Sequence, residues 1–189
     1  MKHITLFTLY TLATLFIASA QKLSKDQQDI KNAVTSFYKW YQKNDHTINS
    51  FKLYKGKKKK DLPPYVIDWK EVDRYFSYIR KNVPLLGEAF IENEKKFFKN
   101  AEKEFIKDPE DEIAPGFDYD RFTGSQEDPK YTVDILLDKK STWSISVAPD
   151  GKTAKVLINH KISSDTEKFR IELDKEGSWR IAKPIEAVQ

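Results

Sequence analysis

Residues 143–162, WSISVAPDGKTAKVLINHKI, carry the pattern that decides the fold. Apolar and polar residues alternate from Trp143 to Val147, and the alternation resumes from Ala154 to Ile162 after the Asp150-Gly151 pair. A period of two is typical of a strand with one packed face, and Asp-Gly is a preferred two-residue hairpin turn. The stretch therefore predicts two antiparallel strands joined by a tight turn.

The same period extends to both sides of this hairpin. Upstream it covers 131–137, where only Leu136 interrupts it, and downstream it covers 169–173 and 179–181, which Lys175-Glu176-Gly177 separates. Consecutive strands with short connections pair as antiparallel neighbours. The C-terminal part of the chain therefore predicts a β-meander with one packed face and one face in water.

The N-terminal part has the helical period instead. Ser24-Lys25-Asp26-Gln27 has the form of a capping box, and apolar residues follow it at helical spacing as far as Tyr41. Asp68 is expected to cap a second helix, and a third is expected over about 88–107. Residues 108–129 are rich in Gly, Pro and Asp and predict a loop.

Helices followed by a strand meander predict an α+β fold. The helical stripes need an apolar partner and the sheet offers one apolar face. We therefore expect the N-terminal helices to pack on a curved antiparallel β-meander, as in a cone-type fold, with Phe37 and Phe97 buried against the sheet. A single domain over residues 21–189 is expected, with a pocket at the open end of the cone.

Composition excludes several classes of function. The 189 residues are 13% aromatic and 33% charged and include no Cys, so disulfides, cysteine zinc sites and thiol nucleophiles are excluded. A net charge of +4 is too small to indicate nucleic-acid binding. With six glycines and none of the common nucleotide, hydrolase or zinc motifs, the sequence predicts no cofactor and no metal.

The first 20 residues have the form of a secretory signal peptide. Met1-Lys2-His3 is basic, Ile4 to Ile17 is mostly apolar, and Ala18-Ser19-Ala20 is an A-x-A cleavage site. The apolar run is shorter than the about 20 residues that a spanning helix needs. We therefore expect a periplasmic or secreted protein with no transmembrane segment after cleavage.

Three segments carry a resemblance to a family of secreted bacterial domains of unknown function. Residues 34–41, VTSFYKWY, resemble its opening helix, and residues 118–127, DYDRFTGSQE, resemble its D-x-D…Q-D/E element, with Glu127 where Asp is usual. Residues 90–98, FIENEKKFF, are similar as well. The family looks like the nuclear-transport-factor-2-like and cystatin-like cone folds. That superfamily includes isomerases, dehydratases, binding subunits and immunity proteins, so the resemblance implies a fold more than an activity.

Asp118, Asp120 and Gln126 are the first candidate site residues. In an extended segment Asp118 and Asp120 would point the same way. Their spacing does not fit an EF-hand, which makes a cation site the weaker interpretation. The favoured interpretation is that the carboxylates accept backbone N–H groups within the loop, and direct contact with a ligand is the alternative.

His160 is the candidate for catalysis. It has the parity of Val156 and Ile158, so its ring should point toward the packed face. A core histidine with one hydrogen bond is the structural interpretation, and a pocket base is the functional one. In the functional interpretation His160 or Asp120 would be the base and Tyr41 would polarise the ligand.

Trp40 and Trp69 are candidate ligand-contacting residues. Trp40 lies off the apolar stripe of its helix, so it covers a second surface or lines a cleft. Most of the aromatic residues are expected in the core, because their rings bury large areas.

Two functions remain open. The favoured one is an exported, non-catalytic domain that binds a protein, a peptide or a glycan, for example an immunity or inhibitor protein. The alternative is a small cone-fold isomerase or hydrolase. An enzyme needs His160 or Asp120 in an open, partly apolar cavity, and that requirement separates the two.

The A-x-A site predicts a processed protein that begins at Gln21. Intact-mass and N-terminal peptide analysis of the exported fraction should find this end. A full-length chain that stays in the membrane fraction would contradict the prediction.

Overall fold

The computed structural model describes residues 23–58, 62–112, 114–126 and 128–188. The predicted signal peptide, residues 1–20, lies outside them. The helices are α1 (Lys25–Ile48), α2 (Trp69–Asn82), α3 (Glu88–Lys107) and α4 (Pro129–Leu137). The strands are β1 (Tyr54–Gly56), β2 (Tyr65–Ile67), β3 (Thr142–Val147), β4 (Thr153–Ile162), β5 (Asp165–Glu176), β6 (Ser178–Ile181) and β7 (Glu186–Ala187). None of the helices in these ranges is long and apolar enough to cross a membrane.

The predicted antiparallel meander is confirmed from Thr142 to Ile181. Strands β3, β4, β5 and β6 pair in chain order, all antiparallel, and β7 pairs with β5. Ile145 pairs with Val156, and Val156 pairs with Ile171, so the apolar residues of adjacent strands lie on one face. The Asp150-Gly151 turn joins β3 to β4, and Gly151 has a φ of 69°, which glycine adopts without strain.

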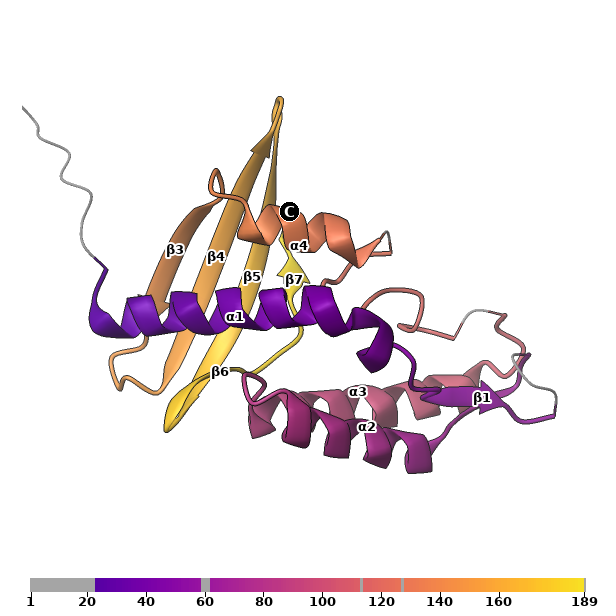
Figure 1. Ribbon diagram of the computed structural model, residues 1–189. Helices are drawn as coiled ribbons and strands as arrows, with labels where there is room; N and C mark the ends of the chain where they lie inside the picture. The colour runs from indigo at the N-terminus through magenta and orange to yellow at the C-terminus, as the bar shows by residue number, and fades with distance from the viewer. Residues whose placement is uncertain (1–22, 59–61, 113, 127, 189) are drawn as a thin grey trace, which may run out of the picture.

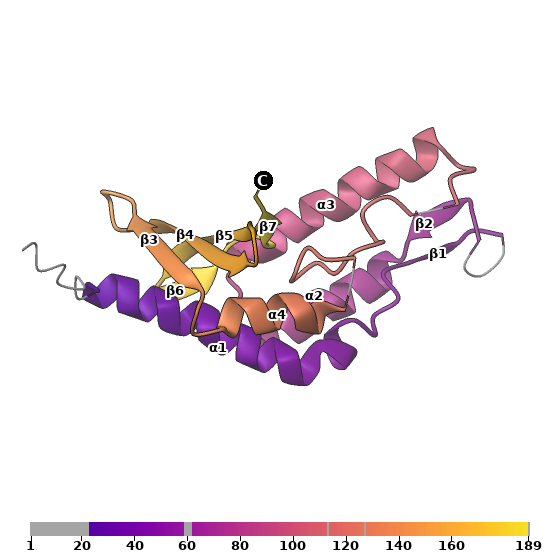
Figure 2. The same cartoon turned by 90° about the horizontal axis from the view of Figure 1, so that it is seen from above.

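Helix α1 covers the apolar face of the sheet, and α4 lies beside it (Figures 1 and 2). The predicted capping box is present: the side chains of Ser24 and Gln27 each bond to the other's backbone. Gln27 also donates to the Ile145 carbonyl at 2.9 Å, and the Trp179 indole donates to Asp26 at 3.0 Å. The first turn of α1 is therefore fixed to both β3 and β6, and the fold is α+β as predicted.

Helices α2 and α3 form a second unit with the small β1–β2 sheet. They extend away from the large sheet instead of lying on it (Figure 1). A β-bridge between Leu86 and Ile181 and a hydrogen bond of 2.9 Å from Asn93 to the Ala182 carbonyl attach the base of this unit to the end of β6.

This arrangement corrects the expectation for Phe97. Phe37 is buried as predicted, but Phe97 is only half-buried. Its ring centroid lies 5.3 Å from that of Phe98 and 5.2 Å from that of Phe117. Phe97 therefore packs within the second unit, because α3 carries it away from the sheet.

The prediction of a strand over 131–137 is wrong, because this segment is helix α4. Asp128 caps the helix by accepting from the Lys130 backbone N–H at 2.9 Å, and Pro129 occupies the first turn, where its missing N–H costs nothing. The residues that it buries, Thr132, Val133, Ile135 and Leu136, have helical spacing. Leu136, which interrupts the strand-like alternation, fits the helical spacing of these buried residues and so indicates the helix.

Phe97 and Phe98 are neighbours on α3 and provide a test of the second unit. Phe98 is fully buried, so Phe98→Ala should lower the free energy of unfolding by about 3–5 kcal/mol. Phe97→Ala should cost about 1–2 kcal/mol, because the half-exposed ring gains less from burial. Urea unfolding measures both, and equal losses would mean that the register of α3 is wrong.

Candidate functional site

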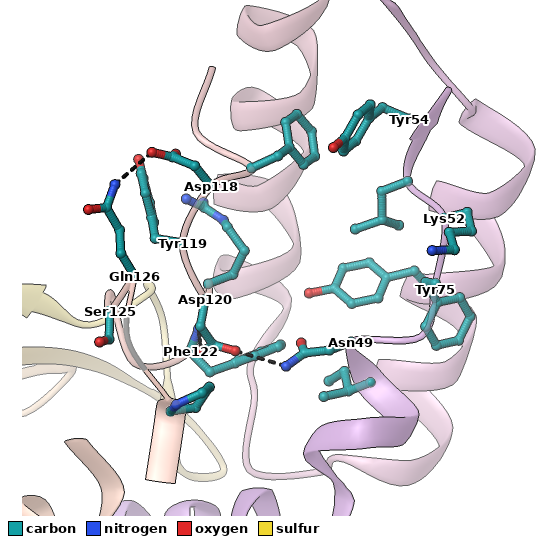
Figure 3. Close-up of a pocket in the computed structure, with 16 residues that line it drawn as sticks. Asn49, Lys52, Tyr54, Tyr75, Asp118, Tyr119, Asp120, Phe122, Ser125 and Gln126 are labelled. Atoms are coloured by element: carbon teal, nitrogen blue, oxygen red, sulfur yellow. Dashed lines mark hydrogen bonds between the residues drawn. The ribbon is translucent and has the colours of Figure 1, made fainter. Parts of the chain in front are cut away.

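A cavity of about 450 Å³ lies between the end of α1, the segment that leads into β1, helix α2 and the loop at 117–126 (Figure 3). Six aromatic residues line it: Phe51, Tyr54, Tyr75, Phe117, Tyr119 and Phe122. Its polar lining includes Asp118, Asp120, Arg121 and Gln126. Three of the sequence-predicted site residues, Asp118, Asp120 and Gln126, therefore come together here.

Two glycines allow the loop to fold as it does. Gly116 has a φ of 79° and Gly124 a φ of 64°, in the left-handed region that side chains disfavour. A Cβ on Gly116 would also lie 2.7 Å from the Phe97 ring. Between them, the Asp120 N–H donates to the Ser125 carbonyl at 2.9 Å and closes the turn.

Asp120 holds this loop through its carboxylate. One oxygen accepts from the backbone N–H groups of Phe122 and Thr123, at 2.9 and 2.8 Å, and from the Thr123 hydroxyl at 2.9 Å. The other oxygen accepts from the Tyr41 hydroxyl and from the Asn49 amide, the latter at 2.9 Å. A carboxylate offers about four lone-pair positions, so these five donors leave Asp120 no free position for a ligand's proton.

Tyr41 is a partner of Asp120 and does not line this cavity. Burial, followed by the charge of Asp120 and the hydrogen bond to it, raises the pKa of the Tyr41 phenol. The phenol therefore stays protonated and directs its hydrogen at the carboxylate. In this arrangement Tyr41 is not placed to polarise a ligand in the cavity.

A buried ion pair forms the inner wall. Glu94 is fully buried on α3 and accepts from Arg121 at 2.6 Å (Nη2) and 3.4 Å (Nε). The guanidinium carbon also lies 3.8 Å from the centre of the Phe97 ring. Burial raises the pKa of Glu94, and the charge and hydrogen bonds of Arg121 oppose part of that increase.

Phe122 anchors the loop in the main core. It is buried, and its ring stacks on Phe90 and packs against Tyr41, with ring centroids 5.8 and 5.2 Å apart. The Tyr38 hydroxyl donates to the Phe122 carbonyl at 3.1 Å. Residues 120–122 are therefore tied to both α1 and α3.

Tyr75 is a buried residue whose hydroxyl faces the cavity. Only 2% of the residue is exposed, and its hydroxyl makes no hydrogen bond with any residue in the described ranges. In Figure 3 this hydroxyl points across the cavity toward the loop that carries Asp120. Burial and then the charge of Glu94 raise the pKa of the phenol, so it stays neutral and able to donate.

Asp118 and Gln126 form the outer rim. The Gln126 amide donates to one Asp118 oxygen at 2.7 Å, and both residues are exposed. Among the described residues no group of three or more His, Asp or Glu side chains is placed to hold a metal ion.

His160 lies apart from this cavity, near the end of β4. It is half-buried, and its Nδ1 lies 2.9 Å from the Ser141 hydroxyl oxygen. Ser141 gives its own hydrogen to the Ile135 carbonyl at 2.6 Å, so Nδ1 must be the donor in this pair. The histidine thus connects the segment between α4 and β3 to β4 through one hydrogen bond, and it does not line the cavity that Asp120 lines.

Trp40 and Trp69 do not line the cavity either. Trp40 is half-buried and its ring stacks on Phe37 at 6.2 Å. Trp69 is half-buried at the start of α2, and its indole donates to Glu102 at 2.8 Å. Trp40 thus packs against the core from its own helix, and Trp69 connects α2 to α3.

Sequence reasoning missed Arg121, Tyr75 and the buried partner Glu94. Glu94 carried a usable signal, because it lies between Phe90 and Phe98 on the apolar side of its helix. A charge in that position needs a counter-charge. Tyr75 carried no such signal, since the helical pattern assigns it to the core in the same way as Phe76.

Asp120 and Asp118 form a matched pair for testing the loop. Asp120→Ala should lower the free energy of unfolding by about 3 kcal/mol or more, because each buried donor that loses its acceptor costs about 1–3 kcal/mol. Asp118→Ala should change it by less than about 0.5 kcal/mol, as exposed substitutions do. Thermal and urea unfolding distinguish the two variants, and similar losses would contradict the anchoring role of Asp120.

Comparisons with known proteins identify no relative of this chain. No family model, no curated protein and no solved structure matches the chain. The resemblance to secreted domains and to cone-shaped folds therefore stays a prediction. The arrangement of Asp120, Arg121 and Tyr75 around the cavity is the basis for a function.

Proposed function

We propose that this protein is an exported, non-catalytic binding domain for a protein, peptide or glycan ligand, and that the cavity beneath the 117–126 loop is its ligand site. An immunity or inhibitor protein is one form of this function. We also propose a cone-type fold, which is supported by the way α1 lies across an antiparallel meander.

One observation carries the proposal: the two less exposed carboxylates next to the cavity, Asp120 and Glu94, are committed to structural hydrogen bonds, while Asp118 lies exposed at its rim. Asp120 accepts five donors, and Glu94 is paired with Arg121. A general base needs a free lone pair within reach of the proton that it removes. The cavity is therefore preorganised to hold a ligand and poorly equipped to move a proton.

The alternative, a small isomerase or hydrolase with His160 or Asp120 as base, gains no support from this geometry. His160 does not line the cavity. Asp120 lines it but is saturated, and the Tyr41 hydroxyl donates its hydrogen bond to Asp120. Pocket-lining aromatic rings with a few oriented polar groups are typical of binding sites.

The proposal predicts that ligands bind in the cavity and are released without chemical change. The purified protein would be screened by amide-resolved NMR against a mixed library of sugars, short peptides and small acids. Binders should shift the resonances of the cavity residues, and each recovered ligand should be chemically intact after long incubation.

Ser125→Trp should abolish these shifts, because the indole would fill the cavity from its loop side. Ser144→Trp, an exposed position on β3, is the control and should leave them in place. Turnover of a ligand that His160→Ala or Asp120→Asn abolishes would overturn the proposal in favour of the enzyme.

A further inference from the structure

The inner end of the cavity presents free hydrogen-bond donors. The Tyr75 hydroxyl has no hydrogen-bond partner among the described residues, although only 2% of the residue's surface is exposed. Arg121 uses Nε and Nη2 for Glu94, while its Nη1 makes no hydrogen bond within the described ranges. Both residues line the cavity. Arg121 can only donate, whereas the Tyr75 hydroxyl can donate or accept. An oxygen of a hydroxyl, a ring ether or a carbonyl can accept from both residues at this end.

The outer end presents acceptors. Gln126 donates its amide to one oxygen of Asp118, so its own carbonyl oxygen and the second Asp118 oxygen are unpaired within the described ranges. On the α1 side of the cavity, the Asn49 amide donates to Asp120 and to the Tyr41 oxygen, which leaves its carbonyl oxygen without a partner in the described ranges. A ligand that spans the cavity thus needs acceptors at one end and donors at the other.

The charges around the cavity are balanced. Lys52 and Arg121 are cationic, and Asp118 and Asp120 are anionic. Glu94 neutralises Arg121 from behind, and Asp120 is saturated by its own donors. No excess of positive charge is therefore present to hold an acid, and Asp118 is the one of these carboxylates that keeps a free oxygen within the described ranges. The lining favours an uncharged ligand over an acid.

Between the two ends the walls are aromatic and partly accessible. Phe51, Tyr54 and Phe117 are half-buried, and the rings of Tyr54 and Phe117 contact each other at 4.6 Å. Such ring faces and edges pack against the C–H surface of a ligand and exclude water from it. The ligand therefore combines hydroxyl groups with an apolar face.

We propose that the cavity binds a neutral sugar, one or two rings of an uncharged glycan, whose oxygens accept from Tyr75 and Arg121 and whose hydroxyls donate to the Asp118–Gln126 rim. This inference rests on the proposed function and names its ligand class. A cavity of about 450 Å³ is the size of a small-ligand site, which spans about 300–1,000 Å³.

The test is an amide-resolved NMR titration of the purified protein with three neutral disaccharides: maltose, cellobiose and N,N′-diacetylchitobiose. The neutral peptide acetyl-Ala-Phe-Ala-amide and the acid 3-phenylpropionate are titrated in parallel at the same millimolar concentrations. At least one disaccharide should shift the cavity resonances, and it should do so at lower concentration than the peptide or the acid.

Tyr75→Phe is the decisive variant. The hydroxyl that it removes has no partner in the described part of the chain, so the fold should be retained with unchanged or higher thermal stability. Disaccharide affinity should fall about five- to tenfold, the value of one hydrogen bond of about 1 kcal/mol. Tyr78→Phe removes a hydroxyl from the next turn of α2, outside this cavity, and should bind as the unmodified protein does.

The outcomes separate the two proposals. If the peptide or the acid shifts the cavity resonances and no disaccharide does, the sugar inference is wrong and the binding function stands. If a disaccharide binds in the cavity equally well in Tyr75→Phe, the assigned contacts are wrong and the inference falls. If every ligand that binds shifts resonances elsewhere on the protein, both proposals fail.

Discussion

The buried charge of Glu94 is the constraint on which the rest of the molecule depends. Glu94 lies in the apolar stripe of α3 with no exposed surface, and a carboxylate in that position needs a counter-ion. Arg121 supplies it from the loop, 27 residues further along the chain, at 2.6 Å. The guanidinium also covers the Phe97 ring, so one side chain closes the inner wall and shields the pair from water.

The residues on either side of Arg121 extend this attachment to the other half of the fold. Asp120 bonds to Tyr41 and Asn49 of the α1 end, and Phe122 enters the core between Phe90 and Tyr41. Three consecutive residues thus join a helical unit to a helix-covered sheet. The cavity is the space left where these units meet, and Asp120, Arg121 and Phe122, which line it, also hold the loop in place.

Much of the fold could be predicted from the sequence, because periodicity reports which face of an element is buried. The hairpins around Asp150-Gly151 and Gly177, the capping box at Ser24 and the bounds of α3 follow from residues that are neighbours in the chain. The strand prediction for 131–137 was wrong because a short apolar run fits both the strand period and the helical period. Asp128 and Pro129, just before the segment, start the helix.

The candidate site could be predicted only in part. The loop residues Asp118, Asp120 and Gln126 were identified by their types, but the partners that give them their roles are distant in sequence. Tyr41 and Asp120 are separated by 79 positions, and no local pattern indicates that pair. The place of Trp69 could not be predicted for the same reason, because its hydrogen-bond acceptor, Glu102, lies on another helix and is distant in sequence.

The position of α1 has a consequence for how the chain folds. Its contacts at the first turn are made with residues 118 and 153 positions later, at Ile145 and Trp179. Helix α1 therefore has an apolar face with no sheet to cover until strands β3 to β6 have been synthesised. Contacts at such separation form slowly, because a long loop must close before they contribute. The nascent chain thus carries α1 as an exposed amphipathic helix until β3 and β6 have been made, and only then can the layer of helix on sheet assemble.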